Sequence, residues 1–310
     1  MLINDGVIHL VKNEYWPNEP NFGFLTPTVF SDEVNSPFKL LFGGVRDTLG
    51  RSVIRSLRLY PNLRVVPESK ICFDRRNSGE FDTDGTILGH INQVNKTLRM
   101  YYVGFRKSRK VKFQAFSGLA ESLDFGRSFT FKRRIFTKLP TSLDYRSGVD
   151  IIACHWNNLD ANGNGEALIA IGNGWKDIDQ KQFPMYSSYF VRAENFEISE
   201  VVGRIPQVTG IYRLGRPRFF YSKQQRTSLI VATGGKENGD YRPYFFEYKN
   251  GNVITREDLQ MPVLPGDYLF CKKQVSYPEF ASFYDHQIDV CIFNGDRMGE
   301  EGCFALRSQI

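Results

Sequence analysis

The sequence has 310 residues and a formal net charge of +6 at neutral pH. A chain of this length buries a large core, and single all-β domains of somewhat over 200 residues are common, so length alone does not require two domains. The lysines and arginines are scattered along the sequence and form no long basic run, which argues against a nucleic-acid-binding arm and leaves small anionic ligands as candidate partners.

The cysteines and the N-terminus point to a reducing compartment. The five cysteines are odd in number, and three of them lie among apolar residues typical of strands, so we expect buried free thiols. Residues 1–5 lack the basic start and apolar core of a secretory signal, and no apolar run has membrane-spanning length. We therefore expect a cytoplasmic protein without a membrane span.

A repeated pair of strand-like runs organises the chain. The 26 Phe, 15 Tyr and 27 Gly residues, together with the lack of a long apolar 3.6-residue period, favour strands and tight turns. The first runs of the pairs are 24–30, 84–92, 148–156, 214–221 and 276–283. The second runs are 38–47, 97–106, 167–176, 227–236 and 287–296.

This repeat predicts the fold. The five pairs recur at intervals of roughly 60 residues, a period that suits a β-propeller blade. We expect an all-β protein: a single five-bladed β-propeller domain over residues 1–310, with four-stranded antiparallel blades around a central pocket. The expected blades are approximately residues 22–72, 81–136, 147–203, 209–258 and 270–310, with 6–11 as a strand that could close the ring.

Two turns resemble functional motifs. Residues 122–129 resemble the Asp-box hairpin of carbohydrate-active propellers, but a turn in which Asp124 accepts backbone hydrogen bonds explains them without a catalytic role. Residues 160–165 begin like a calcium loop, but the twelfth position is Ile171, where a bidentate glutamate is needed. We predict no metal site and no cofactor.

The propeller predicts where chemistry should lie. The start of each first strand and the end of each second strand meet at one face. The candidate catalytic residues there are Asp47, Asp84 and Asp144. The candidate substrate-binding residues are Arg46, Asp82, Arg106, Arg146, Trp175, Lys176, Arg213, Arg216, Tyr277 and Asn294. Cations outnumber acids among them, which indicates a negatively charged substrate, although each residue could instead be an ordinary polar loop residue.

The order of several short motifs resembles the five-bladed propellers related to glycoside hydrolase family 43, the superfamily of arabinanases, xylosidases and invertases. The motifs are 42–47 (FGGVRD), 81–86 (FDTDGT), 100–104 (MYYVG), 118–122 (GLAES), 215–217 (GRP), 276–278 (SYP) and 293–299 (FNGDRMG). Within that superfamily, the sequence is most similar to a bacterial branch associated with surface-polysaccharide biosynthesis.

The resemblance also implies carboxylates that this chain lacks. Hydrolases of the superfamily carry a catalytic Asp at the start of the first inner strand, where residues 22–27 hold no acid, and a general-acid Glu that 174–176 and 210–213 do not provide. Hydrolysis normally needs two carboxylates, whereas an activated donor already carries a good leaving group.

The first reading is therefore glycosyl transfer from an activated anionic donor, such as a nucleotide sugar, in surface-polysaccharide (O-antigen or capsule) biosynthesis. Asp84 or Asp47 would be the base, the arginines would bind the anion, and Trp175 and Tyr277 would stack on sugar or base. It also implies association with other polysaccharide-biosynthesis enzymes. Two alternatives stay open: a hydrolase of arabinofuranosides or xylosides that uses two of the aspartates, and a noncatalytic sugar-binding propeller.

Overall fold

The structure is a computed structural model of the chain. It describes residues 2–3, 6–12, 16, 21–30, 36–68, 70–139, 149–178, 180–222, 225–236, 240–249, 252–267, 269–283 and 288–307.

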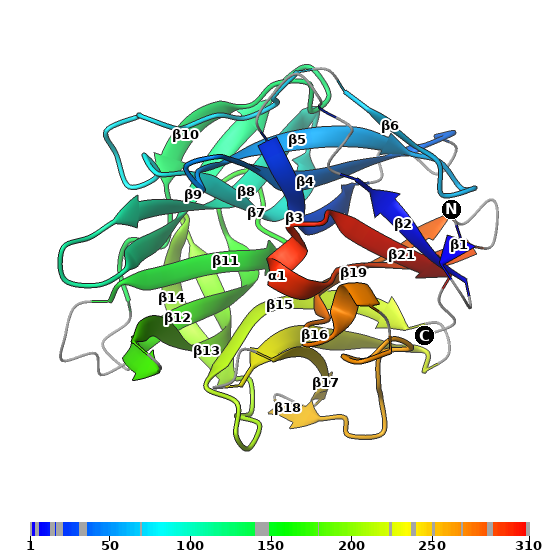
Figure 1. Cartoon of the computed structure of the whole chain (residues 1–310). Coiled ribbons are helices and arrows are strands. Elements are labelled where there is room, and N and C mark those ends of the chain that lie inside the picture. Colours follow the sequence, from blue (N-terminus) through cyan, green and yellow to red (C-terminus); the bar gives the residue numbers. More distant parts are fainter. Residues whose placement is uncertain are drawn as a thin grey trace.

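The strands form five consecutive antiparallel groups around an axis (Figure 1). The first blade contains β3 (Asn21–Phe30), β4 (Lys39–Asp47), β5 (Ser52–Leu59) and β6 (Val65–Pro67). The second contains β7 (Thr86–Val94), β8 (Thr97–Lys107), β9 (Phe113–Ser122) and β10 (Thr130–Arg134). The third contains β11 (Ile151–Asn157), β12 (Gly165–Ile178), β13 (Lys181–Glu194) and β14 (Glu197–Arg204). The fourth contains β15 (Arg213–Ser222), β16 (Thr227–Gly235), β17 (Tyr241–Lys249) and β18 (Asn252–Thr255).

The fifth blade combines both ends of the chain. Its strands from the axis outward are β19 (Ser276–Phe283), β20 (Ile288–Asn294), β21 (Cys303–Arg307), β2 (Val7–Val11) and β1 (Leu2–Ile3). Strand β2 pairs antiparallel with β21, with Ile8 opposite Ala305, and it buries Val7, Leu10 and Val11. The N-terminal strand thus covers an edge that β21 would otherwise expose.

The fold is all-β, a five-bladed propeller, as the sequence predicts. The helical segments in the described residues are the 3-10 turn Leu269–Cys271 and the short helix α1 (Asp296–Gly299). The apolar core lies largely between neighbouring blades; one cluster, for example, joins Tyr101 and Leu119 of the second blade to Ile152 and Ile169 of the third.

A repeated contact fixes the start of three inner strands, β11, β15 and β19. The third strand of a blade pairs in parallel with residues at or just before the next inner strand, as in Ala115 with Ile151 and Tyr186 with Arg213. Tyr241 makes the same kind of bridge with Gln274, next to β19. These contacts hold the inner-strand starts at one face, which also carries α1 and the ends of the second strands. We call it the α1 face; α1 lies at its front in Figure 1.

Candidate functional site

All five inner strands carry an irregularity where they approach the axis. The strand registers shift at Thr26, Gly89, His155, Arg216 and Tyr277. Thr26, Arg216 and Tyr277 have φ values of 54°, 53° and 55°, and each precedes a proline. Proline suits a bulge because it donates no ladder hydrogen bond. The X-Pro pairs therefore mark, in the sequence, the places where inner strands turn a side chain out of the regular ladder.

Two of these bulge residues, Arg216 and Tyr277, belong to a cationic cluster on the α1 face. The guanidinium carbon of Arg216 lies 5.5 Å from the centre of the Tyr277 ring. Burial raises the pKa of Tyr277, while the charges of Arg216, Arg46 and Arg213 oppose that shift. The charges of three predicted anion-binding arginines thus act on one phenol; we call these four residues the arginine cluster.

The arginines of this cluster are held by carbonyl and aromatic groups. Arg216 donates to the carbonyls of Leu88 at 2.6 Å and Thr26 at 2.9 Å, and Arg213 donates to the carbonyl of Lys236 at 2.7 Å. Arg213 also lies 4.6 Å from the Phe183 ring and 4.9 Å from the Tyr241 ring. Among the described residues, no carboxylate forms an ion pair with Arg46, Arg213 or Arg216.

Desolvation supports a role for the cluster in holding an anion. Burial lowers the pKa of Arg216 to about 9 and also lowers that of Arg46, in the latter case against the charges of Tyr277 and Glu300. A guanidinium whose charge is poorly compensated gains from a bound anion, and its planar fork matches carboxylate or phosphate oxygens.

Two predicted aspartates are occupied by structural partners. Asp82 is fully buried and accepts hydrogen bonds from Arg75 at 2.9 Å, Ser78 at 2.7 Å and Tyr102 at 2.6 Å. Asp47 accepts from the Nε of Arg51 at 2.9 Å and from Arg76 at 3.2 Å, and it also caps backbone amides of its own turn. Burial opposes ionisation of Asp47, but the hydrogen bonds from Arg51 hold its pKa below the ordinary value.

The carboxylate of Asp84 is less engaged by protein groups than those of Asp47 and Asp82. It is half-buried just before β7, and its Oδ2 accepts the backbone N–H of Lys107 at 2.7 Å. Asp150 directly precedes β11, and its Oδ1 accepts from Gln114 at 3.1 Å. Within the described part of the chain, the second oxygen of each carboxylate has no hydrogen-bond donor. Asp150 is not among the candidates predicted from the sequence; an acid within two residues of an inner strand, as at Asp84, is the signal that marks it.

Asn294 ties the last blade to the first. It is fully buried, accepts from the Thr26 amide at 3.0 Å, and donates to the carbonyls of Phe24 at 2.7 Å and Gly302 at 2.9 Å. Its amide is therefore saturated by backbone groups.

Trp175 and Lys176 lie at the end of β12. The Trp175 ring packs edge-on against Phe113 at 4.9 Å, and Phe113 packs against Phe105 at 5.4 Å. Lys176 lies 4.5 Å from the Tyr212 ring. Lys176, Tyr212, Arg213 and Lys236 line one small pocket of about 10 Å³.

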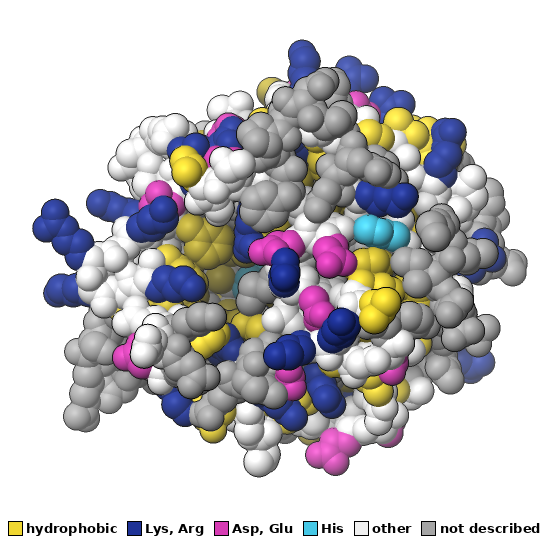
Figure 2. Space-filling model, viewed as in Figure 1, with side chains coloured by type: hydrophobic (Ala, Val, Ile, Leu, Met, Phe, Trp, Pro, Cys, Tyr) yellow, Lys and Arg dark blue, Asp and Glu magenta, His cyan; other side chains and the backbone are white. Residues whose placement is uncertain are grey.

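Arg106 is exposed at the end of β8. Asp144 and Arg146 lie outside the described residues. Figure 2 shows lysine, arginine and carboxylate side chains around the centre of the α1 face.

The axis beneath the cluster is polar and buried. Arg218 forms an ion pair with Glu279 and donates to Thr28 Oγ1 at 2.7 Å and to the Gly89 carbonyl. His90 and His155 lie beside these arginines, and burial lowers the pKa of both imidazoles. Both histidines are thus neutral groups of the interior.

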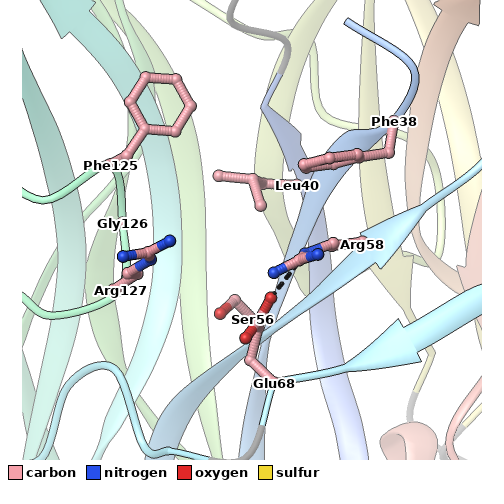
Figure 3. Close-up of a pocket in the computed structure, with 8 residues that line it drawn as sticks. All are labelled: Phe38, Leu40, Ser56, Arg58, Glu68, Phe125, Gly126 and Arg127. Atoms are coloured by element: carbon pink, nitrogen blue, oxygen red, sulfur yellow. Dashed lines mark hydrogen bonds and ion pairs between the residues drawn. The ribbon is translucent and has the colours of Figure 1, made fainter.

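A separate cavity of about 210 Å³ lies between the first two blades, away from the α1 face (Figure 3). Its lining residues are Phe38, Leu40, Ser56, Arg58, Glu68, Phe125, Gly126 and Arg127. Arg58 and Glu68 pair at 2.8 Å within it. No predicted site residue lines this cavity.

The described residues include no cluster of three or more His, Cys, Asp or Glu side chains that could hold a metal ion. In the same part of the chain, no helix is long and apolar enough to span a membrane.

The chain resembles solved glycoside hydrolases in fold. A thermostable family-43 glycoside hydrolase aligns with a TM-score of 0.62 at 10% identity, over 92% of this chain and 88% of that one. The α-L-arabinofuranosidase of Lactobacillus brevis aligns with a TM-score of 0.62 at 10% identity, over 99% of this chain and 94% of that one. An exo-1,5-α-L-arabinanase from a bovine ruminal metagenomic library aligns with a TM-score of 0.56 at 11% identity, over 94% of both chains. No protein-family model and no curated protein matches the sequence. These similarities establish the propeller fold that the protein shares with these enzymes.

Proposed function

We propose that the protein acts on a negatively charged carbohydrate at the α1 face, as a glycoside hydrolase. The observation that carries the proposal is the arginine cluster: Arg216 lies against the Tyr277 ring, the charges of Arg46 and Arg213 also act on that phenol, and no described carboxylate forms an ion pair with the three arginines. A uronic acid or a sugar phosphate offers the anion that such guanidinium groups bind. The aromatic ring of Tyr277 offers a surface for a sugar ring.

Hydrolysis has more support than transfer. Solved structures with this fold include a family-43 glycoside hydrolase, an arabinofuranosidase and an arabinanase. Asp84 and Asp150 each keep one oxygen without a donor among the described residues, as a general acid or base requires. Transfer from a nucleotide sugar, a role in surface-polysaccharide biosynthesis and association with enzymes of that process stay predictions from the sequence.

Binding without turnover is the second candidate. Asp47 and Asp82 are engaged by arginine and hydroxyl donors, and residues 24–27 at the first inner strand carry no acidic side chain. Such a protein would recognise an acidic sugar through the same arginine cluster and would not cleave it.

The test combines hydrolysis and binding. Aryl glycosides of glucuronic and galacturonic acid are compared with the matching neutral glycosides, and phenol release is measured. For Arg46→Gln we expect KM for the acidic substrate to rise about tenfold with little change in kcat, because one ground-state anion contact is lost. For Asp84→Asn we expect kcat to fall by about 10² or more. Lys249→Gln, on the opposite face, is the matched control.

The outcomes separate the candidates. Thermal stabilisation by the acidic sugars without phenol release would support binding alone. Equal or better hydrolysis of the neutral glycosides, unaffected by Arg46→Gln, would refute the anionic-substrate proposal.

We also propose the cytoplasm as the protein's location. All five cysteines are buried and none of them forms a disulfide, as expected in a reducing compartment. Fractionation of the native host would test this, and recovery of the protein outside the cytoplasm would contradict it.

A further inference from the structure

A basic loop stands at the edge of the α1 face. It spans residues 106–112 and joins β8 to β9. Its five cations are Arg106, Lys107, Arg109, Lys110 and Lys112, and all are exposed. In the described part of the chain none of them forms an ion pair with a carboxylate. The basic residues are therefore less evenly scattered than the sequence analysis held, and Figure 2 shows lysine and arginine side chains projecting at the left edge of this face.

The base of the loop is fixed. The ladder between β8 and β9 continues to the pair of Lys107 and Phe113. Asp84 holds the Lys107 amide at 2.7 Å, and the Lys110 amide donates to Ser108 at 3.3 Å. The charges are thus presented by an anchored hairpin.

Aromatic and basic residues connect the loop to the arginine cluster. The edge-on contacts run from Phe105 at the base of the loop through Phe113 to Trp175. Lys176 follows Trp175 and shares a pocket with Arg213 and Lys236. We call the surface from the basic loop over Trp175 and Lys176 to Lys236, beside the buried Arg213, the basic strip.

Few acids interrupt the basic strip. Asp84 and Asp150 lie beside its start and accept hydrogen bonds from Lys107 and Gln114, and Asp177 is exposed next to Lys176. The cations of the loop, Lys176, Lys236 and Arg213 outnumber them. A ligand with a single charge at the arginine cluster would leave the loop unused, whereas a chain with repeated charges would contact both.

We infer that the ligand is an acidic polysaccharide rather than a single acidic sugar. One charged residue of the chain occupies the arginine cluster, and neighbouring residues follow the basic strip to the loop. This inference rests on the proposed function for its choice of a sugar polymer over another polyanion. The loop adds affinity through exposed charges, which salt screens.

The experiment measures binding of polygalacturonate and of monomeric galacturonate to wild type and to the triple variant Arg109→Gln, Lys110→Gln and Lys112→Gln. At about 0.01 M salt, where the Debye length is about 30 Å, we expect the variant to bind the polymer at least about tenfold more weakly. At about 1 M salt, where the Debye length is about 3 Å, the difference in polymer affinity between the two proteins should largely vanish. Monomer affinity should be the same in both proteins.

A second triple variant controls for net charge. Lys96→Gln, Arg127→Gln and Lys249→Gln remove the same three charges from exposed turns at the opposite face. This control should bind the polymer like wild type. An equal loss in both triple variants, or no polymer binding by wild type, would overturn the inference even if monomer binding and hydrolysis are intact.

Other polymers test the chemical class of the ligand. Dextran, a neutral polymer, should bind no better than monomeric sugar. If single-stranded DNA binds more tightly than polygalacturonate and loses affinity in the loop variant, the strip serves nucleic acid and the inference is wrong.

Discussion

Asp82 shows how a residue at the predicted site serves the fold. Its carboxylate joins Arg75, Ser78 and Tyr102, and no part of the residue is exposed. Burial raises the pKa of the Tyr102 phenol, and the hydrogen bond to Asp82 raises it further, so Tyr102 stays a neutral donor.

Asp82→Asn should lower the free energy of unfolding by about 2–4 kcal/mol, because the partly buried Arg75 guanidinium and the buried Tyr102 hydroxyl lose a charged acceptor. Urea denaturation measures the loss. Asp74→Asn, at the partly exposed pair with Arg76, should cost less than about 1 kcal/mol. Equal effects of the two substitutions would show that the buried network is not stabilising.

The axial histidines make stability depend on pH. Burial, together with the smaller effect of the charges of Arg218 and Arg216, lowers the pKa of His90 to about 3. Burial also lowers the pKa of His155. An unfolded histidine titrates at about 6.5, so the folded state binds fewer protons below that pH. Stability from these groups is complete above pH about 6.5 and is lost as the pH falls toward the folded pKa values.

We expect the free energy of unfolding of the wild type, measured by urea denaturation, to fall between pH 7 and pH 5 by up to about 1.4 kcal/mol per pH unit for each histidine. His155→Gln should have a shallower dependence over the same range, whatever its stability at pH 7. A slope that is unchanged in His155→Gln would contradict the assignment of the effect to this imidazole.

At the scale of elements, the hairpin between β9 and β10 is a rigid turn. Asp124 accepts from the Ser128 amide at 2.9 Å and hydroxyl at 2.6 Å, and from Ser122 at 2.8 Å. These are the backbone and side-chain bonds that the sequence analysis expected of a turn. The hairpin lies at the face opposite α1, beside the cavity of Figure 3.

Asp124→Ala should therefore lower stability by about 1 kcal/mol through lost turn hydrogen bonds and leave sugar binding unchanged. Thermal unfolding and the binding assay on the α1 face measure the two effects. A loss of sugar affinity with an intact fold would show that the turn reaches the site.

At the scale of the whole molecule, closure of the ring depends on residues far apart in sequence. Leu10 of β2 is 1% exposed and packs in a cluster with Cys303 and Ala305 of β21. Leu10→Ala should lower the free energy of unfolding by about 2–4 kcal/mol, because it leaves a cavity between the chain ends.

Leu123→Ala is the matched control for this prediction, since Leu123 is 86% exposed on a turn, and it should change stability by less than about 0.5 kcal/mol. Guanidinium denaturation of both variants gives the comparison. A small effect of Leu10→Ala would mean that β2 adds little to ring closure.

The sequence by itself determined the fold class and placed the strands closely. The run predicted at 84–92 lies over β7 (Thr86–Val94), and that at 214–221 lies within β15 (Arg213–Ser222), because aromatic and β-branched runs between glycine turns are a local signal. It also named Arg46, Arg213, Arg216 and Tyr277, whose shared face follows from strand direction alone.

Only the tertiary structure decided which polar groups are engaged. The partners of Asn294 lie in Phe24 and Thr26, some 270 residues away, and Arg216 binds the carbonyls of Thr26 and Leu88 from two other blades. No local pattern encodes such contacts, because the closed ring brings together strands that are remote in sequence. For that reason Asp84, with one oxygen that has no donor among the described residues, and Asp82, buried and saturated, look alike in the sequence and differ in the folded protein.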